Sequence, residues 1–127
     1  PRETGRAQLL DGVGKDEIVT EDRLTRIQSF LLRDGPREAT LVRMNTPWQA
    51  SPVERLGEIK TPTLILWGAD DTWVPVHGAH VFDEKIPNSN LILYEGVGHI
   101  PMEEVPAASA ADLATFLKAL APHPGSE

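Results

Sequence analysis

Side chains that exchange protons follow two short apolar segments of this sequence. Residues 64–67 (Leu-Ile-Leu-Trp) precede Asp70 and Asp71, and residues 91–94 (Leu-Ile-Leu-Tyr) precede a loop that contains His99. A carboxylate beside an imidazole holds the ring in one tautomer and stabilises it when it is protonated. Asp71 and His99 are therefore the types of residue that form the acid–base part of a nucleophilic triad.

Purely structural roles are the alternative for each of these side chains. His99 could be hydrogen-bonded to backbone in its loop, but the neighbouring glycines and its place after a strand favour catalysis. Asp70 and Asp71 could both cap turns, and we expect one of them to do so. His77 and His80 fall near the start of a predicted helix and are interpreted as surface residues. No second cluster completes a metal site with them, so we expect no metal and no cofactor.

The elements that position Asp71 and His99 are predicted to be two parallel strands. Unbroken apolar runs such as residues 64–67 and 91–94 are typical of strands buried on both faces. Residues 76–85 between them predict a helix, so the three segments form a βαβ unit. The carboxyl ends of parallel strands meet at one edge of the sheet, where ligands bind in α/β folds. We therefore expect Asp71 and His99 to lie at the same edge.

Helices are predicted for most of the remaining chain. Residues 1–19 predict a helix end and a loop, and residues 20–58 predict amphipathic helices. Thr20 is placed to cap the first of these helices, which Asp34 and Gly35 end, and Pro36 is suited to begin the next one. Ser51 to Glu54 have the pattern of a capping box. A last helix is predicted over residues 107–120, with Glu103 and Glu104 at its start.

Length and composition exclude several classes of protein. The 127 residues suffice for one domain at most, and the net charge of −7 argues against nucleic-acid binding. There is no cysteine, so disulfides and thiolate sites are excluded. No apolar run is long enough for a membrane span. The compartment is not identified, although a cytoplasmic location is favoured. The chain begins at Pro1 without an initiator methionine, and we expect an internal cut there.

The pattern Gly68-x-x-Asp71-x-x-x-Pro75, followed by Gly98-His99, resembles the carboxyl-terminal part of α/β-hydrolase-fold enzymes. The resemblance covers residues 56–120, and residues 1–50 are similar, less specifically, to the end of the helical cap of that family. It implies a triad in the order serine, acid, histidine, with Asp71 as the acid and His99 as the base. Asp70 is the rival acid, and the Gly-x-x-Asp spacing favours Asp71.

The resemblance divides the chain into three parts. Residues 1–58 are expected to be a cap remnant with a connecting helix, residues 59–121 the βαβα part of a mostly parallel α/β sheet, and residues 122–127 a loose tail. Two strands cannot satisfy the edges of such a sheet, so we expect the chain to be part of a domain.

The nucleophile that the family requires is not evident. No Gly-x-Ser-x-Gly occurs in the sequence. None of the five serines lies on a strand-to-helix turn: Ser29, Ser51, Ser89, Ser109 and Ser126. The resemblance therefore implies that the nucleophile and the oxyanion donors lie outside this chain. The expected partner is an amino-terminal half that carries the serine, or a second copy that exchanges elements. Alone, the chain is expected to be inactive.

The residue after the candidate base favours one substrate class. Carbon–carbon bond hydrolases and epoxide hydrolases of the family often have an aromatic residue after the histidine, whereas here Ile100 follows His99. The resemblance thus favours an esterase or lipase that acts on a small carboxylic ester through an acyl-serine. Haloperoxidase-like, lactone-cleaving and carbon–carbon bond hydrolases remain alternatives. A non-catalytic module that binds a partner through its apolar sheet edge and helix faces is the alternative from another class.

Overall fold

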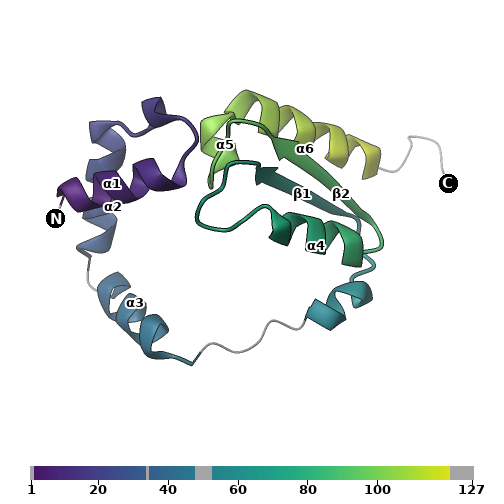
Figure 1. The fold of residues 1–127 in the computed structure, drawn as a ribbon, viewed down its shortest axis with the longest axis horizontal. Helices are drawn as coiled ribbons and strands as arrows, with labels where there is room; N and C mark the ends of the chain where they lie inside the picture. The colour runs from purple at the N-terminus through teal and green to yellow at the C-terminus, as the bar shows by residue number, and fades with distance from the viewer. Residues whose placement is uncertain (1, 34, 48–52, 121–127) are drawn as a thin grey trace.

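The structure is a computed structural model that describes residues 2–33, 35–47 and 53–120. It is an α/β fold in which short helices precede a two-stranded sheet with helices on both faces (Figure 1). In chain order the elements are α1 (Arg2–Gly12), η1 (Asp16–Ile18), α2 (Glu21–Leu31), α3 (Pro36–Asn45), η2 (Val53–Glu58), β1 (Thr63–Gly68), α4 (His77–Lys85), β2 (Ser89–Tyr94), α5 (Pro101–Glu104) and α6 (Pro106–Leu120).

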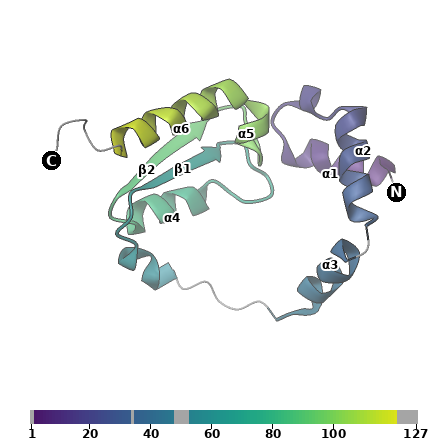
Figure 2. The same cartoon turned by 180° about the vertical axis from the view of Figure 1, so that it is seen from behind.

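The βαβ unit predicted from the sequence is present. Strands β1 and β2 are parallel, in a register that pairs Thr63 with Ser89 and Gly68 with Tyr94. Helix α4 connects them and contacts both strands, while α6 contacts β1. Figures 1 and 2 show α4 and α6 on opposite sides of the sheet. The α/β fold class and the parallel pairing are confirmed.

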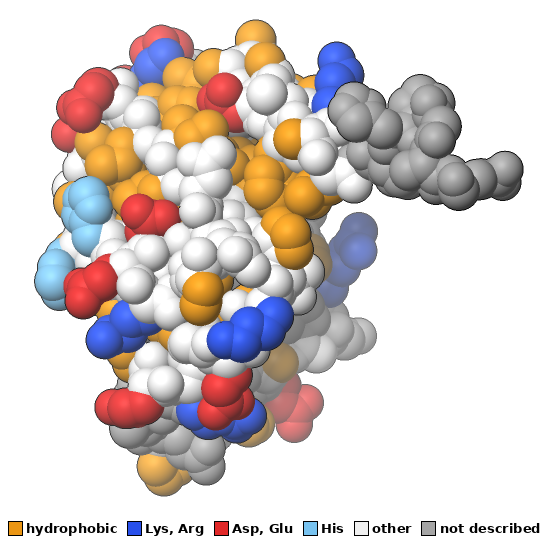
Figure 3. All heavy atoms as spheres, turned by 90° about the vertical axis from the view of Figure 1, so that its right-hand side faces the viewer, with side chains coloured by type: hydrophobic (Ala, Val, Ile, Leu, Met, Phe, Trp, Pro, Cys, Tyr) orange, Lys and Arg blue, Asp and Glu red, His pale blue; other side chains and the backbone are white. Residues whose placement is uncertain are grey.

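The strands are less buried than their apolar sequences predicted. In β1 only Ile65 and Gly68 are buried, and no residue of β2 is fully buried. The reason is that the sheet has two strands within the described residues, so each strand has an unpaired edge. Leu113, Leu117 and Leu120 of α6 are also exposed. Figure 3 shows hydrophobic side chains gathered at the surface in the upper part of the view, where α6 lies.

The amino-terminal helices begin where the sequence predicted. Thr20 caps α2, because its Oγ1 accepts a hydrogen bond from the backbone N–H of Arg23. Pro36 is the first residue of α3, and Gly35 before it has a φ of 99° that favours glycine. Leu24 of α2 is buried. Some predictions fall outside the described residues, namely those for Asp34, Ser51, Pro52 and the tail at residues 122–127. The three-part division of the chain remains a prediction. Residues 53–58, at the capping-box pattern, form a 3₁₀ helix.

The helix predicted over residues 107–120 is confirmed as α6, but a separate short helix precedes it. Residues 101–104 form α5, and α6 begins separately at Pro106. Proline has no N–H to donate and disfavours helical backbone at the residue before it, so Val105 adopts φ −133° and ψ 58° and separates the helices. The expectation that Glu103 and Glu104 begin the last helix is therefore wrong. Within the described residues every helix is too short or too polar to cross a bilayer.

Tyr94 joins the end of β2 to α6. Its hydroxyl donates a hydrogen bond of 2.7 Å to Oδ2 of Asp112. Burial, and then the Asp112 carboxylate, raise the pKa of Tyr94 from the ordinary 10.0 to about 12. The neutral phenol is thus favoured in the folded chain.

Because Tyr94 is the only tyrosine, its ionisation is directly visible in the near-ultraviolet absorbance of the phenolate. We expect a titration midpoint at about pH 12 for the folded chain. Between pH 10.0 and about 12 the unfolded chain ionises first, so this contribution to folding stability is lost as the pH rises. Asp112→Asn should lower the midpoint, whereas Glu84→Gln, an exposed change on α4, should not. A wild-type midpoint at the ordinary value would contradict this assignment.

Candidate active site

The segments after the two strands stay together beyond the sheet. The N–H of Ala69 donates to the carbonyl of Tyr94, and the N–H of Asp70 donates to the carbonyl of Val97, each at 2.9 Å. A Cβ on Gly68 would lie only 2.0 Å from the carbonyl oxygen of Gly98. Gly68 is therefore required for this close approach, which carries both loops from the same edge of the sheet.

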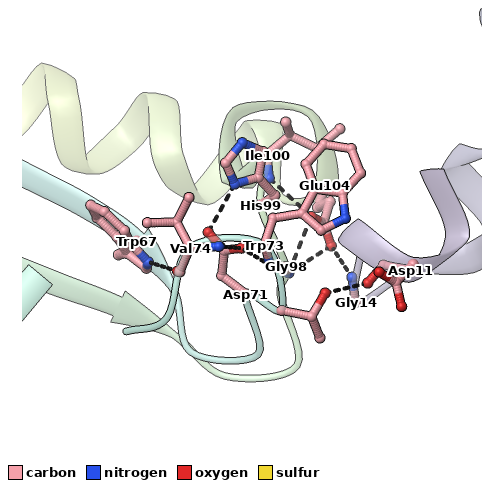
Figure 4. Close-up of polar contacts among 11 residues, drawn as sticks. Asp11, Gly14, Trp67, Asp71, Trp73, Val74, Gly98, His99, Ile100 and Glu104 are labelled. Atoms are coloured by element: carbon pink, nitrogen blue, oxygen red, sulfur yellow. Dashed lines mark hydrogen bonds and ion pairs between the residues drawn. The ribbon is translucent and has the colours of Figure 1, made fainter. Parts of the chain in front are cut away.

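Asp71 is held by both of its carboxylate oxygens. Its side chain is 4% exposed. Oδ1 accepts hydrogen bonds of 2.9 Å from the backbone N–H groups of Trp73 and Val74, and Oδ2 lies 2.9 Å from Nδ1 of His99 (Figure 4). Asp71 thus caps the turn and contacts His99 with the same side chain, while its role in catalysis remains a prediction. Asp70, the rival acid, has an exposed side chain.

His99 presents its second ring nitrogen away from Asp71. An ionised carboxylate can only accept at the 2.9 Å contact, so Nδ1 is the donor there, and in the neutral imidazole the lone pair is on Nε2. Within the described residues Nε2 has no hydrogen-bond partner, and the side chain is 35% exposed. The backbone N–H of His99 donates to the carbonyl of Gly12 at 2.7 Å. The imidazole is thus oriented as a base with an open acceptor.

Apolar side chains line the space around this pair. The ring of Trp73 lies 5.0 Å from the ring of His99, measured between centroids and tilted by 47°. A hollow of about 160 Å³ lies at the pair, with walls that include Leu66, Trp67, Val74 and Met102. Such walls lower the local dielectric and strengthen electrostatic interactions within the hollow.

Glu104 supports the histidine loop, a role that the sequence did not indicate. The residue is 5% exposed, and its carboxylate accepts hydrogen bonds from the N–H groups of Gly14 (2.8 Å), Gly98 (3.0 Å) and Ile100 (3.2 Å). These three donors compensate the burial of the charge. Glu104 therefore fixes the backbone on both sides of His99 and joins it to the loop after α1, as Figure 4 shows.

The loop after α1 contacts the segments that carry Asp71 and His99. The Thr72 hydroxyl donates to the carbonyl of Asp11, and a Cβ on Gly12 would collide with the Trp73 ring. Trp73 therefore packs between this loop and His99.

The other candidate residues lie apart from the pair. His77 and His80 are exposed on α4, and in the described part of the chain no three metal-ligating side chains form a group. The three described serines hydrogen-bond locally: Ser29 to the carbonyl of Arg26, Ser89 to Asp83, and Ser109 to the carbonyl of Pro106. None of them contacts His99.

Comparison with known proteins agrees with the fold. The family model of the α/β hydrolase fold matches residues 20–106. Monoacylglycerol lipase ABHD6 of Mus musculus is 33% identical over 81 residues, which are 64% of this chain and 24% of that protein. The 2-hydroxy-6-oxo-6-phenylhexa-2,4-dienoate hydrolase of Burkholderia cepacia is 40% identical over 52 residues, covering 41% of this chain and 18% of that protein. The chain thus spans a quarter or less of these relatives.

A solved structure is similar over nearly the whole chain. The meta-cleavage product hydrolase CumD of Pseudomonas fluorescens IP01 superposes with a TM-score of 0.86, covering 95% of this chain and 47% of that chain. At 20% sequence identity this likeness concerns the fold alone.

Glu104→Gln should lower the free energy of unfolding by about 2 kcal/mol, because an amide replaces a buried carboxylate that accepts from three N–H groups. Glu103→Gln is the matched control, since Glu103 is exposed and pairs with Arg23 at the surface, where an ion pair contributes about 0–1 kcal/mol. Urea denaturation measures both variants. Equal losses in the two variants would contradict the role assigned to Glu104.

Proposed function

This chain belongs to the α/β-hydrolase fold family, and we propose that it supplies the acid and the base of a serine-dependent ester hydrolase. The observation that carries the proposal is the contact of 2.9 Å between Asp71 Oδ2 and His99 Nδ1, which leaves Nε2 open. In this arrangement Nε2 accepts a proton while the carboxylate stabilises the imidazolium that forms.

The proposed reaction proceeds in two halves. His99 Nε2 takes the proton of a serine hydroxyl as its oxygen attacks the ester carbonyl, and the imidazolium then gives that proton to the leaving alcohol. Water next attacks the acyl-serine, His99 takes the proton of the water, and the proton returns to the serine as the acid leaves. Asp71 remains ionised throughout and keeps the ring in one orientation.

We propose that the nucleophile and the oxyanion donors belong to a segment outside this sequence. The absence of Gly-x-Ser-x-Gly and the local hydrogen bonds of the three described serines support this proposal. The chain also covers 24% of the mouse lipase and 47% of CumD, so relatives have a large portion that this chain lacks. An amino-terminal half, or a second copy that exchanges elements, is the proposed partner.

A carboxylic ester is the favoured substrate because Ile100 follows His99 and because the match to the mouse monoacylglycerol lipase extends over 81 residues. Carbon–carbon bond hydrolysis is the second candidate, favoured by the 40% identity to the Burkholderia cepacia hydrolase. Assays with a p-nitrophenyl ester and with 2-hydroxy-6-oxo-6-phenylhexa-2,4-dienoate distinguish the two.

In the polypeptide that includes this chain and the nucleophile, Asp71→Asn should lower kcat about 10⁴-fold, because the wrong tautomer of His99 is then favoured. His99→Ala should cause a loss at least as large. Asp70→Asn and His77→Ala are matched controls, since both residues are exposed neighbours of the same types, and each should retain wild-type activity. Activity lost in Asp70→Asn but kept in Asp71→Asn would make Asp70 the acid.

A fluorophosphonate, which labels activated serines, tests where the nucleophile lies. We expect intact-mass analysis to find the adduct on the segment outside residues 1–127. An adduct on one of the five serines of this sequence would overturn that part of the proposal. Failure to label any species, together with inactivity toward both substrates, would favour the partner-binding module instead.

A further inference from the structure

A second and larger cavity borders the loop that contains His99. Its volume is about 520 Å³, within the range of small-molecule sites in proteins. It is formed between the amino-terminal helices and the loop that follows His99, since Leu9 of α1, several residues of α2, and Ile100 line it. Because Ile100 directly follows His99, this cavity lies beside the acid–base pair.

One wall of the cavity is apolar. Leu9, Ile27, Phe30 and Ile100 line it, and Ile27 and Phe30 lie one helical turn apart on α2. Phe30 is 58% exposed, although it is a large aromatic residue. These side chains offer a surface for an apolar chain.

Three arginines line the same cavity. Arg23 forms an ion pair with Glu103, so its charge is already compensated. Arg26 and Arg33 also line the cavity, and neither has an acidic partner among the described residues. The chain as a whole carries a net charge of −7, so two uncompensated cations beside an apolar wall form a local exception.

We propose that this cavity binds a single-chain amphiphile with an anionic head group, with its apolar chain against Ile27 and Phe30 and its head group against Arg26 and Arg33. Guanidinium forks hydrogen-bond to carboxylate and phosphate oxygens, and the charge assistance makes such bonds stronger than neutral ones. The preferred substrates are then esters of such amphiphiles, an inference that rests on the proposed function.

Isothermal titration of the full chain with decanoate, decyl phosphate and decanol tests the proposal, each ligand being kept below the concentration at which it self-assembles. We expect both anions to bind at one site, decyl phosphate more tightly because its charge matches two guanidinium groups. Decanol should bind at least tenfold more weakly than decanoate, on the order expected for charge-assisted hydrogen bonds. Equal affinity for decanol and decanoate would overturn the proposal.

Variants separate the contributions of the two walls. The double variant Arg26→Gln and Arg33→Gln should weaken both anions about tenfold or more and leave decanol unchanged. A double variant Lys85→Gln and Lys118→Gln removes the same charge from α4 and α6, away from the cavity, and should bind like wild type. Phe30→Ala should weaken all three ligands. Unchanged affinity of the anions in the arginine variant would contradict the assignment.

His99→Ala distinguishes this proposal from the proposed function. The variant should bind decanoate with wild-type affinity, because His99 does not line the cavity. If anion binding requires Arg26 and Arg33 but hydrolysis does not require His99, the amphiphile site stands and the proposed function is refuted. Hydrolysis that requires His99 without any binding of decanoate or decyl phosphate would refute the amphiphile site alone.

Discussion

The close approach of Gly68 to the backbone of residues 97 and 98 is the contact on which the site depends. A Cβ at Gly68 would lie 2.0 Å from the carbonyl oxygen of Gly98 and 2.3 Å from that of Val97, so any side chain would force the two segments apart. The hydrogen bonds from Ala69 and Asp70 continue the pairing of the strands past their ends. Asp71 and His99 can meet only because both loops leave the sheet together.

The chemistry follows from how little freedom Asp71 retains. Two backbone N–H groups and the imidazole share its buried carboxylate, so the carboxylate is oriented before any substrate arrives. Preorganised charge of this kind requires no rearrangement during a proton transfer. In the proposed function the pair is only the proton-transfer part of a hydrolase, because a separate nucleophile must give its proton to Nε2.

The short helix α5 links the acid–base pair to the amino-terminal helices. Glu104 holds the backbone at Gly98 and Ile100 while it also accepts from Gly14. The neighbouring Glu103 pairs with Arg23 of α2. Adjacent residues of α5 therefore anchor the base and the wall of the larger cavity, so the position of a bound amphiphile and the position of His99 depend on the same four-residue helix.

The chemical pair and the elements that carry it were predictable from the sequence by itself. Apolar runs bounded by Pro62 and Gly68, a helix between two strands, and an acid and a histidine after the strand ends are local patterns. A βαβ unit leaves few ways to arrange them. The separation of α5 from α6 at Pro106 is also a local effect, although the sequence analysis overlooked it.

Only the tertiary structure decided which structural role each acidic side chain has. Glu103 and Glu104 are identical in type and adjacent, yet one lies at the surface and the other accepts from a glycine 90 residues earlier in the chain. Likewise, the sequence left open whether Asp71 caps a turn or contacts His99, and in the folded chain it does both. Such roles depend on contacts between distant segments, and a periodic pattern along the chain does not predict those contacts.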